Sequence, residues 1–138
     1  MKKLFLIIIY ILISTNILHA ANFKWSKIVS AEDNTMTIYV DKKTVFRVGG
    51  YKYFWLLTDY IDPSDDPVKS VITQVMVNCS AYESRPITFT SFTGNMGKGE
   101  IISDFIVPES EISYFEWTKF DPGETIHGFA LKKVCKRW

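Results

Sequence analysis

Short runs rich in apolar and β-branched residues recur along the chain, and residues with turn chemistry separate them. This pattern is typical of an antiparallel β domain. It predicts six strands, at about 23–30, 36–41, 51–61, 68–79, 86–93 and 99–107. Gly, Pro, Asp, Asn and Ser gather at the predicted breaks, which lie at 32–34, 49–50, 62–67, 84–86 and 94–97.

The third of these runs shows how its strand is buried, because residues two positions apart share one face of a sheet. One face carries Trp55 and Leu57, and the other carries Phe54 and Leu56. Apolar side chains on both faces indicate a strand that is covered on both sides. The third run is therefore predicted to be a central strand.

Near the C-terminus the period of the apolar residues changes from two to 3.6, which indicates a helix. Asp121 is the predicted N-cap, Pro122 the first helical residue, and Glu124 completes a capping box. A helix of about 12 residues is marginal by itself, so we expect it to pack on the sheet. The predicted fold class is α+β: a twisted antiparallel sheet of about six strands with one C-terminal helix on a face.

The first residues carry the features of an export signal. Two lysines precede an uninterrupted apolar run at 4–13, which is shorter than the roughly 20 residues that a spanning helix needs. We predict cleavage after Ala20 or Ala21, giving a signal peptide at 1–20 and a single domain at 21–138. An uncleaved N-terminal anchor is the alternative. The mature protein is then expected in the periplasm, at the cell surface or in the medium, without a transmembrane segment.

The chain has two cysteines, Cys79 and Cys135. Two thiols in an oxidising compartment usually pair, so we predict a disulfide between them. It would tie the end of the helix to a strand. Closing a loop of this length stabilises a domain by about 4 kcal/mol in the chain-entropy model.

The balance of acidic and basic residues bears on whether the protein binds nucleic acid. Without the two lysines of the predicted signal, the chain has 14 Lys and Arg residues and 15 Asp and Glu residues. This near-neutral balance argues against a large basic field, and we expect no nucleic-acid partner.

No residue set stands out as catalytic or metal-binding. His127 is the one histidine outside the predicted signal, whereas a zinc site needs several such ligands. Asp62, Asp65 and Asp66 lack the spacing of an EF-hand, and the glycine-rich stretch 94–100 lacks the spacing of a P-loop. We predict no catalytic residues, no metal, no cofactor and no enzymatic activity. An enzyme that uses His127 with unspecified acids is the minor alternative.

Aromatic residues are unusually frequent, with ten Phe, seven Tyr and four Trp. Large rings fill the core of a thin domain, but some are expected to remain as contact points. Tyr114, Phe115 and Trp117 lie in an irregular stretch before the predicted helix. Aromatic side chains are enriched at protein interfaces, so these three are the candidate interface residues.

Several short motifs follow one another in the order found in a known family. They are Trp25, Tyr39-Val40-Asp41, Trp55-Leu56-Leu57-Thr58-Asp59-Tyr60, Cys79, Gly94-Asn95-Met96-Gly97-Lys98-Gly99-Glu100, Trp117, Pro122-Gly123 and Val134-Cys135. In type and order this set resembles the surface-adhesin protein E family, over about residues 25–135. Two features depart from that pattern: no lipid-anchor cysteine lies near the predicted cleavage site, and Glu124 replaces the Ser that often follows Pro-Gly.

The resemblance implies an envelope protein with a sheet, a disulfide-linked C-terminal helix and non-enzymatic adhesion to host matrix or plasma glycoproteins. The leading hypothesis is therefore an exported binding protein whose ligand is a protein or glycoprotein, such as one of the host extracellular matrix. The alternative is a periplasmic accessory or inhibitor protein that binds an envelope partner, which the missing lipid-anchor cysteine favours. The oligomeric state stays open.

Overall fold

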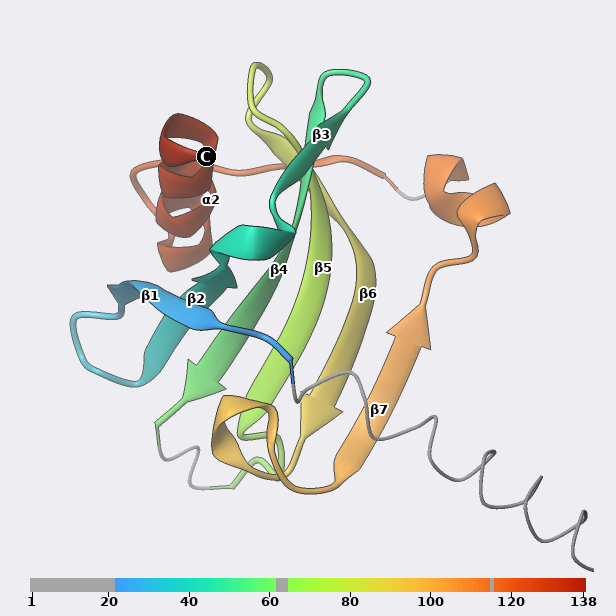
Figure 1. The fold of residues 1–138 in the computed structure, drawn as a ribbon. Coiled ribbons are helices and arrows are strands. Elements are labelled where there is room, and N and C mark those ends of the chain that lie inside the picture. Colours follow the sequence, from blue (N-terminus) through green and yellow to red (C-terminus); the bar gives the residue numbers. More distant parts are fainter. Residues whose placement is uncertain (1–21, 62–64, 115) are drawn as a thin grey trace, which may run out of the picture.

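An antiparallel sheet makes up most of the fold, and one long helix packs on one of its faces (Figure 1). The computed structural model describes residues 22–61, 65–114 and 116–138. The eight strands are β1 (Trp25–Ser30), β2 (Met36–Asp41), β3 (Phe46–Val48), β4 (Tyr51–Tyr60), β5 (Ser70–Asn78), β6 (Glu83–Phe92), β7 (Ile101–Ile106) and β8 (Thr118–Lys119). The main path runs β1-β2-β4-β5-β6-β7, while β3 pairs with β4 and β8 pairs with β6.

The six predicted strands are all present, as β1, β2, β4, β5, β6 and β7. The predicted number was nevertheless too low, because β3 and β8 have only three and two residues and cannot show an alternating pattern. The predicted break at 84–86 is also wrong, since these residues belong to β6. Pro86 pairs with Val75 where the register between β5 and β6 shifts, and such an irregularity accommodates proline within a sheet.

Strand β4 pairs with β2, β3 and β5, so the predicted central strand is confirmed. Its alternate side chains define two faces of the sheet. Phe54 and Leu56 point to the face on which the helix α2 packs, which we call the helix face. Trp55 and Leu57 point to the other, which we call the aromatic face.

Each face has its own apolar cluster. On the helix face, buried residues of β1, β2, β4 and β5 pack against α2; they are Ile28, Ile38, Val40, Phe54, Leu56, Val75, Val77, Ala130, Leu131 and Val134. On the aromatic face, a smaller cluster of Leu57, Ile72 and Phe92 lies among partly buried aromatic rings. The larger core therefore lies between the sheet and the helix.

Helix α2 (Ile126–Arg137) begins later than predicted. Its N-cap is Thr125, whose side chain accepts a hydrogen bond from the Gly128 N–H at 2.9 Å. Asp121 is not the cap, and its carboxylate accepts from the Gly123 N–H in a preceding turn. The reason lies at Gly128, where an added Cβ would be 1.9 Å from the Asp121 carbonyl oxygen. Because the chain at 121 crosses the first helical turn so closely, the helix cannot start at Pro122.

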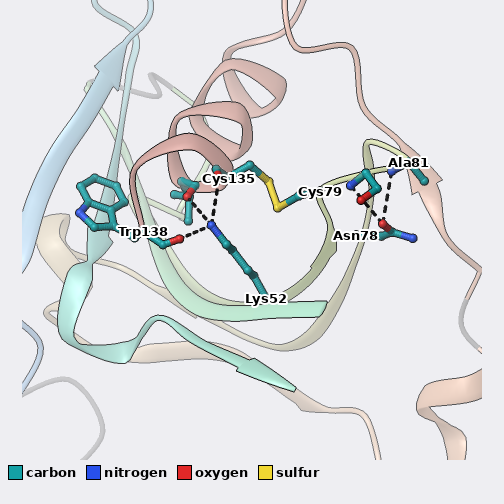
Figure 2. Close-up of a disulfide and its surroundings, with 8 residues drawn as sticks. Lys52, Asn78, Cys79, Ala81, Cys135 and Trp138 are labelled. Atoms are coloured by element: carbon teal, nitrogen blue, oxygen red, sulfur yellow. Dashed lines mark hydrogen bonds between the residues drawn. A yellow bond between two sulfur atoms is a disulfide. The ribbon is translucent and has the colours of Figure 1, made fainter. Parts of the chain in front are cut away.

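Two links hold the C-terminal end of α2 on the sheet (Figure 2). The predicted disulfide between Cys79 and Cys135 is confirmed. Beside it, the buried Lys52 ammonium donates to the main-chain oxygens of Val134, at 3.1 Å, Cys135, at 2.9 Å, and Trp138. Burial lowers the pKa of Lys52, and the nearby Arg47 adds to this effect.

No helix within the described ranges has the length and apolar character needed to cross a membrane. The predicted signal peptide at 1–20 lies outside the described residues.

Candidate binding surface

The β3–β4 hairpin extends the sheet beyond the end of β2 (Figure 1). Val48 pairs with Tyr51 across a two-residue turn, Gly49-Gly50, in which both residues have positive φ. Positive φ at both central positions is the geometry that favours glycine in tight hairpins. Strand β3 thus pairs with the start of β4, while β2 pairs with its later residues.

The hairpin presents apolar side chains on the aromatic face. The Phe46 ring stacks on the Tyr53 ring with centroids 5.0 Å apart and planes 6° apart. Phe46 is 48% exposed, and Val48, opposite Tyr51, is 56% exposed. Apolar side chains on a projecting hairpin are therefore open to solvent without a covering element among the described residues.

A second aromatic stack adjoins the first. Trp117 stacks on Tyr51 with centroids 5.3 Å apart, and the Arg85 guanidinium lies 4.3 Å from the centroid of the Trp117 ring. Pairing of Thr118 in β8 with Ser84 in β6 holds Trp117 next to this strand. We call the resulting group the aromatic surface; its members are Phe46, Val48, Tyr51, Tyr53, Trp117 and the buried Arg85, which supports the Trp117 ring.

Another part of the aromatic face, around Trp55 and Leu57, is covered from within the chain. Phe23, which precedes β1, stacks on Trp25 with centroids 4.7 Å apart and contacts Trp55 at 5.3 Å. Met96, from the 3₁₀ turn η2 (Asn95–Gly97), packs on the same cluster. The aromatic surface lies outside the part of the face that these segments cover.

The glycine-rich stretch that contains η2 has a structural role. Asp59 accepts hydrogen bonds from the Met96 N–H at 2.7 Å and from the Asn95 amide. The Ser70 hydroxyl donates to the Gly94 carbonyl and accepts from the Gly97 N–H. Two polar side chains of the sheet therefore hold this loop in place, which explains a motif that superficially resembles a phosphate loop.

Of the three candidate interface residues, Trp117 belongs to the aromatic surface. Tyr114 is the last residue of the 3₁₀ segment η3 (Glu109–Tyr114), and its side chain lies outside what the structure describes. Phe115 also lies outside the described residues. Their role in an interface stays a prediction.

Sequence reasoning missed the other members of the aromatic surface. A signal for the hairpin was present, because Gly49-Gly50 lies between β-branched and aromatic residues. No local signal identifies Arg85, since only the fold brings β6 next to Trp117.

The described residues include no group of three or more His, Cys, Asp or Glu arranged to hold a metal ion. His127 lies exposed in the first turn of α2. Asp66 accepts from the Val68 N–H within a turn, and Asp62 lies outside the described residues.

The geometry agrees with comparisons to known proteins. The family model described as "Surface-adhesin protein E" matches residues 25–136. Among solved structures, the chain is similar to the selenomethionine form of protein E from Haemophilus influenzae, with a TM-score of 0.51, 14% identity, and coverage of 81% of this chain and 87% of that one. It is also similar to protein E from non-typeable Haemophilus influenzae, with a TM-score of 0.48, 16% identity, and coverage of 86% and 81%. A comparison with curated proteins finds no match.

Proposed function

Because this chain belongs to the surface-adhesin protein E family, we propose that it binds glycoproteins of the host matrix or plasma through the aromatic surface. As a member of that family it is an exported or cell-surface protein with an adhesin-like binding role. The choice of ligand and of the contact residues is the proposal.

One observation carries the assignment of the surface. On the aromatic face, the β3–β4 hairpin leaves Phe46 and Val48 about half exposed beside the stack of Trp117 on Tyr51. Large exposed apolar side chains gathered in one place are typical of interaction sites. Trp and Tyr are also among the residue types most enriched at the positions that dominate binding energy, and the buried Arg85 supports the Trp117 ring.

The stacked arrangement favours tight binding for a second reason. Tyr51 and Arg85 contact the ring of Trp117, and Tyr53 contacts the ring of Phe46. These contacts restrict side chains that would otherwise lose rotamer freedom when a partner binds. The surface therefore supports recognition of a partner without a large ordering cost.

The test is binding of the exported protein to immobilised basement-membrane extract and to a plasma glycoprotein fraction. We expect Trp117→Ala to weaken binding by at least tenfold, as for a central aromatic contact. Phe129→Ala provides the control, because Phe129 is an aromatic residue of helix α2 that is 41% exposed and lies outside the aromatic surface. Its variant should bind within about twofold of the wild type.

Equal weakening by Trp117→Ala and Phe129→Ala would contradict this use of the aromatic surface. Unfolding midpoints of both variants must be measured beside the binding. A Trp117→Ala variant that melts like Phe129→Ala and binds like the wild type would also contradict it.

We further propose that the protein acts without catalysis. His127 is the residue on which the enzyme alternative depends, and it lies exposed on α2 rather than in the aromatic surface. The His127→Ala variant should keep full glycoprotein binding. A turnover activity that this variant loses, with its binding and unfolding midpoint unchanged, would contradict the proposal.

The alternative of a periplasmic accessory or inhibitor protein has one observation in its favour. Strand β7 ends the sheet path, and Ile101, Ile102, Phe105 and Ile106 on it are 40–66% exposed. An exposed edge strand can pair with a strand of another protein. Protease digestion of intact cells separates the two functions: digestion indicates surface display, whereas protection until the outer membrane is opened indicates a periplasmic partner.

A further inference from the structure

The near-neutral net charge conceals a strong separation of charge along the chain. Residues 22–52 and 126–138 together contain ten Lys and Arg but three Asp and Glu, a net of +7. Residues 53–125 contain four Lys and Arg and twelve Asp and Glu, a net of −8. The overall balance, from which we expected no large basic field, therefore says little about the local field.

The fold brings the two positive segments together. Figure 1 shows α2, β1 and β2 on one side of the molecule, with β7 on the opposite side. The Lys133 ammonium of α2 donates to the Ile28 carbonyl of β1 at 2.9 Å. The Lys42 ammonium, in the 3₁₀ turn η1 (Lys42–Thr44), lies 5.1 Å from the centroid of the Trp138 ring.

Five exposed cations belong to η1, β3 and the last turn of α2. These elements are linked by the contact of Lys42 with Trp138 and by Lys52, the cross-strand partner of Arg47, which donates to the end of α2. The five cations form what we call the basic surface: Lys42, Lys43, Arg47, Lys136 and Arg137. Arg47 pairs with Lys52, whose ammonium reaches the end of α2 on the helix face. Alternation along β3 therefore directs Arg47 away from Phe46 and Val48, so the basic and aromatic surfaces lie on opposite faces of the sheet.

The acceptors that the structure records beside these cations already have other donors. Cations near a helix C-terminus often satisfy its free carbonyls, but here Lys52 already donates to three main-chain oxygens there. Asp41, the acid next to η1, is buried and accepts from the main-chain N–H groups of Lys24 and Lys43. Its carboxylate is thus committed to the backbone.

We propose that the basic surface binds a linear sulfated or carboxylated polysaccharide. Such a polymer repeats anionic groups along its length, and cations on several rigid elements can engage more than one of them. Binding of a polyanion by clustered Lys and Arg releases counterions, so the affinity should fall steeply with salt. The partly exposed Trp138 ring beside Lys42 adds a flat apolar face for the C–H groups of a sugar.

The probe is immobilised heparin, and the protein is the exported form used for the glycoprotein binding assay. The test variant combines Lys43→Gln, Arg47→Gln and Lys136→Gln. The matched control combines Lys69→Gln, Lys98→Gln and Lys119→Gln, which removes the same charge from exposed positions of the negative segment. We expect the test variant to bind at least tenfold more weakly, with a shallower salt dependence, and the control to bind within about twofold of wild type.

Equal loss in the test and control variants would overturn the proposal, because net charge alone would then explain binding. Absence of wild-type binding to heparin at physiological salt would overturn it too. Equally tight binding to a DNA duplex or to phosphatidylglycerol vesicles would overturn the assignment to polysaccharide. Tight binding to heparin with weak binding to both of these probes would support it.

Polysaccharide binding by the basic surface is a separate function from glycoprotein binding by the aromatic surface, and the two can be tested independently. The basic-surface variant should keep its binding to a glycoprotein fraction from which polysaccharide chains have been removed by lyases. Trp117→Ala should keep its binding to heparin. Loss of heparin binding in Trp117→Ala would overturn the separation of the two surfaces, whereas loss of glycoprotein binding alone concerns only the aromatic surface.

Discussion

The two faces of the sheet differ in how completely the chain covers them. On the helix face, α2 closes an apolar core around Phe54 and Val134, both fully buried. A disulfide and a buried ammonium hold the end of the helix in place. On the aromatic face, the N-terminal segment and η2 cover only part of the sheet, and Phe46 remains about half exposed.

This difference separates stability from recognition. Burial of apolar area and covalent closure stabilise the fold, and both are concentrated on the helix face. The aromatic face leaves apolar rings in water, which lowers stability but provides contacts for a partner. Substitutions on the helix face should therefore change the free energy of unfolding, whereas those on the aromatic surface should mainly change binding.

The largest effect should come from opening the disulfide. Combining Cys79→Ala with Cys135→Ala frees a loop spanning 56 positions and should lower the free energy of unfolding by about 4 kcal/mol. Urea unfolding measures this loss. Wild-type protein treated with a reductant should approach the variant, which itself should not respond to the reductant. A melt that reduction leaves unchanged would show that the disulfide contributes little.

A smaller loss is expected at Lys52. Lys52→Met keeps an apolar stem but leaves main-chain oxygens at the end of α2 without their donor, which should cost about 2 kcal/mol of unfolding free energy. Arg47→Met, at the exposed cross-strand partner, is the control and should change stability by less than about 0.5 kcal/mol. Urea unfolding of the two variants compares them directly, and equal stabilities would mean that water replaces the ammonium.

The smallest effect tests where the helix begins. Thr125→Ala removes the hydrogen bond to the Gly128 N–H and should lower the free energy of unfolding by about 1 kcal/mol. Asp121→Ala removes only a bond within the preceding turn and should cost less. Thermal melts of the two variants rank them. If Asp121→Ala were the more damaging, Asp121 rather than Thr125 would be the effective cap.

Much of the fold could be predicted because the longer strands show an alternation of apolar residues that can be recognised in the local sequence. Strands of six or more residues alternate long enough for their faces to show, as β4 does with Phe54 and Trp55 on opposite sides. Two cysteines in an exported chain leave one intramolecular pairing. Strand β3 could not be found by alternation, because three residues do not repeat a pattern of period two.

The candidate surfaces were harder to predict than the strands. Trp117 was identified by residue type, but its contacts with Tyr51 and Arg85 join three distant segments. The helix start was misplaced because the capping signal at Asp121 was stronger than the one at Thr125. Only the close approach of the Asp121 carbonyl to Gly128 decides between them.

By itself, the sequence determined the α+β class, the six longer strands, the disulfide and the family resemblance, since periodicity, cysteine count and motif order are all local or countable. The tertiary structure alone decided which side chains meet. It stacks Trp117 on Tyr51. It also brings the positively charged segments 22–52 and 126–138 together on one side of the molecule. Net charge and composition are sums over the chain, whereas binding depends on where charges and rings lie in space.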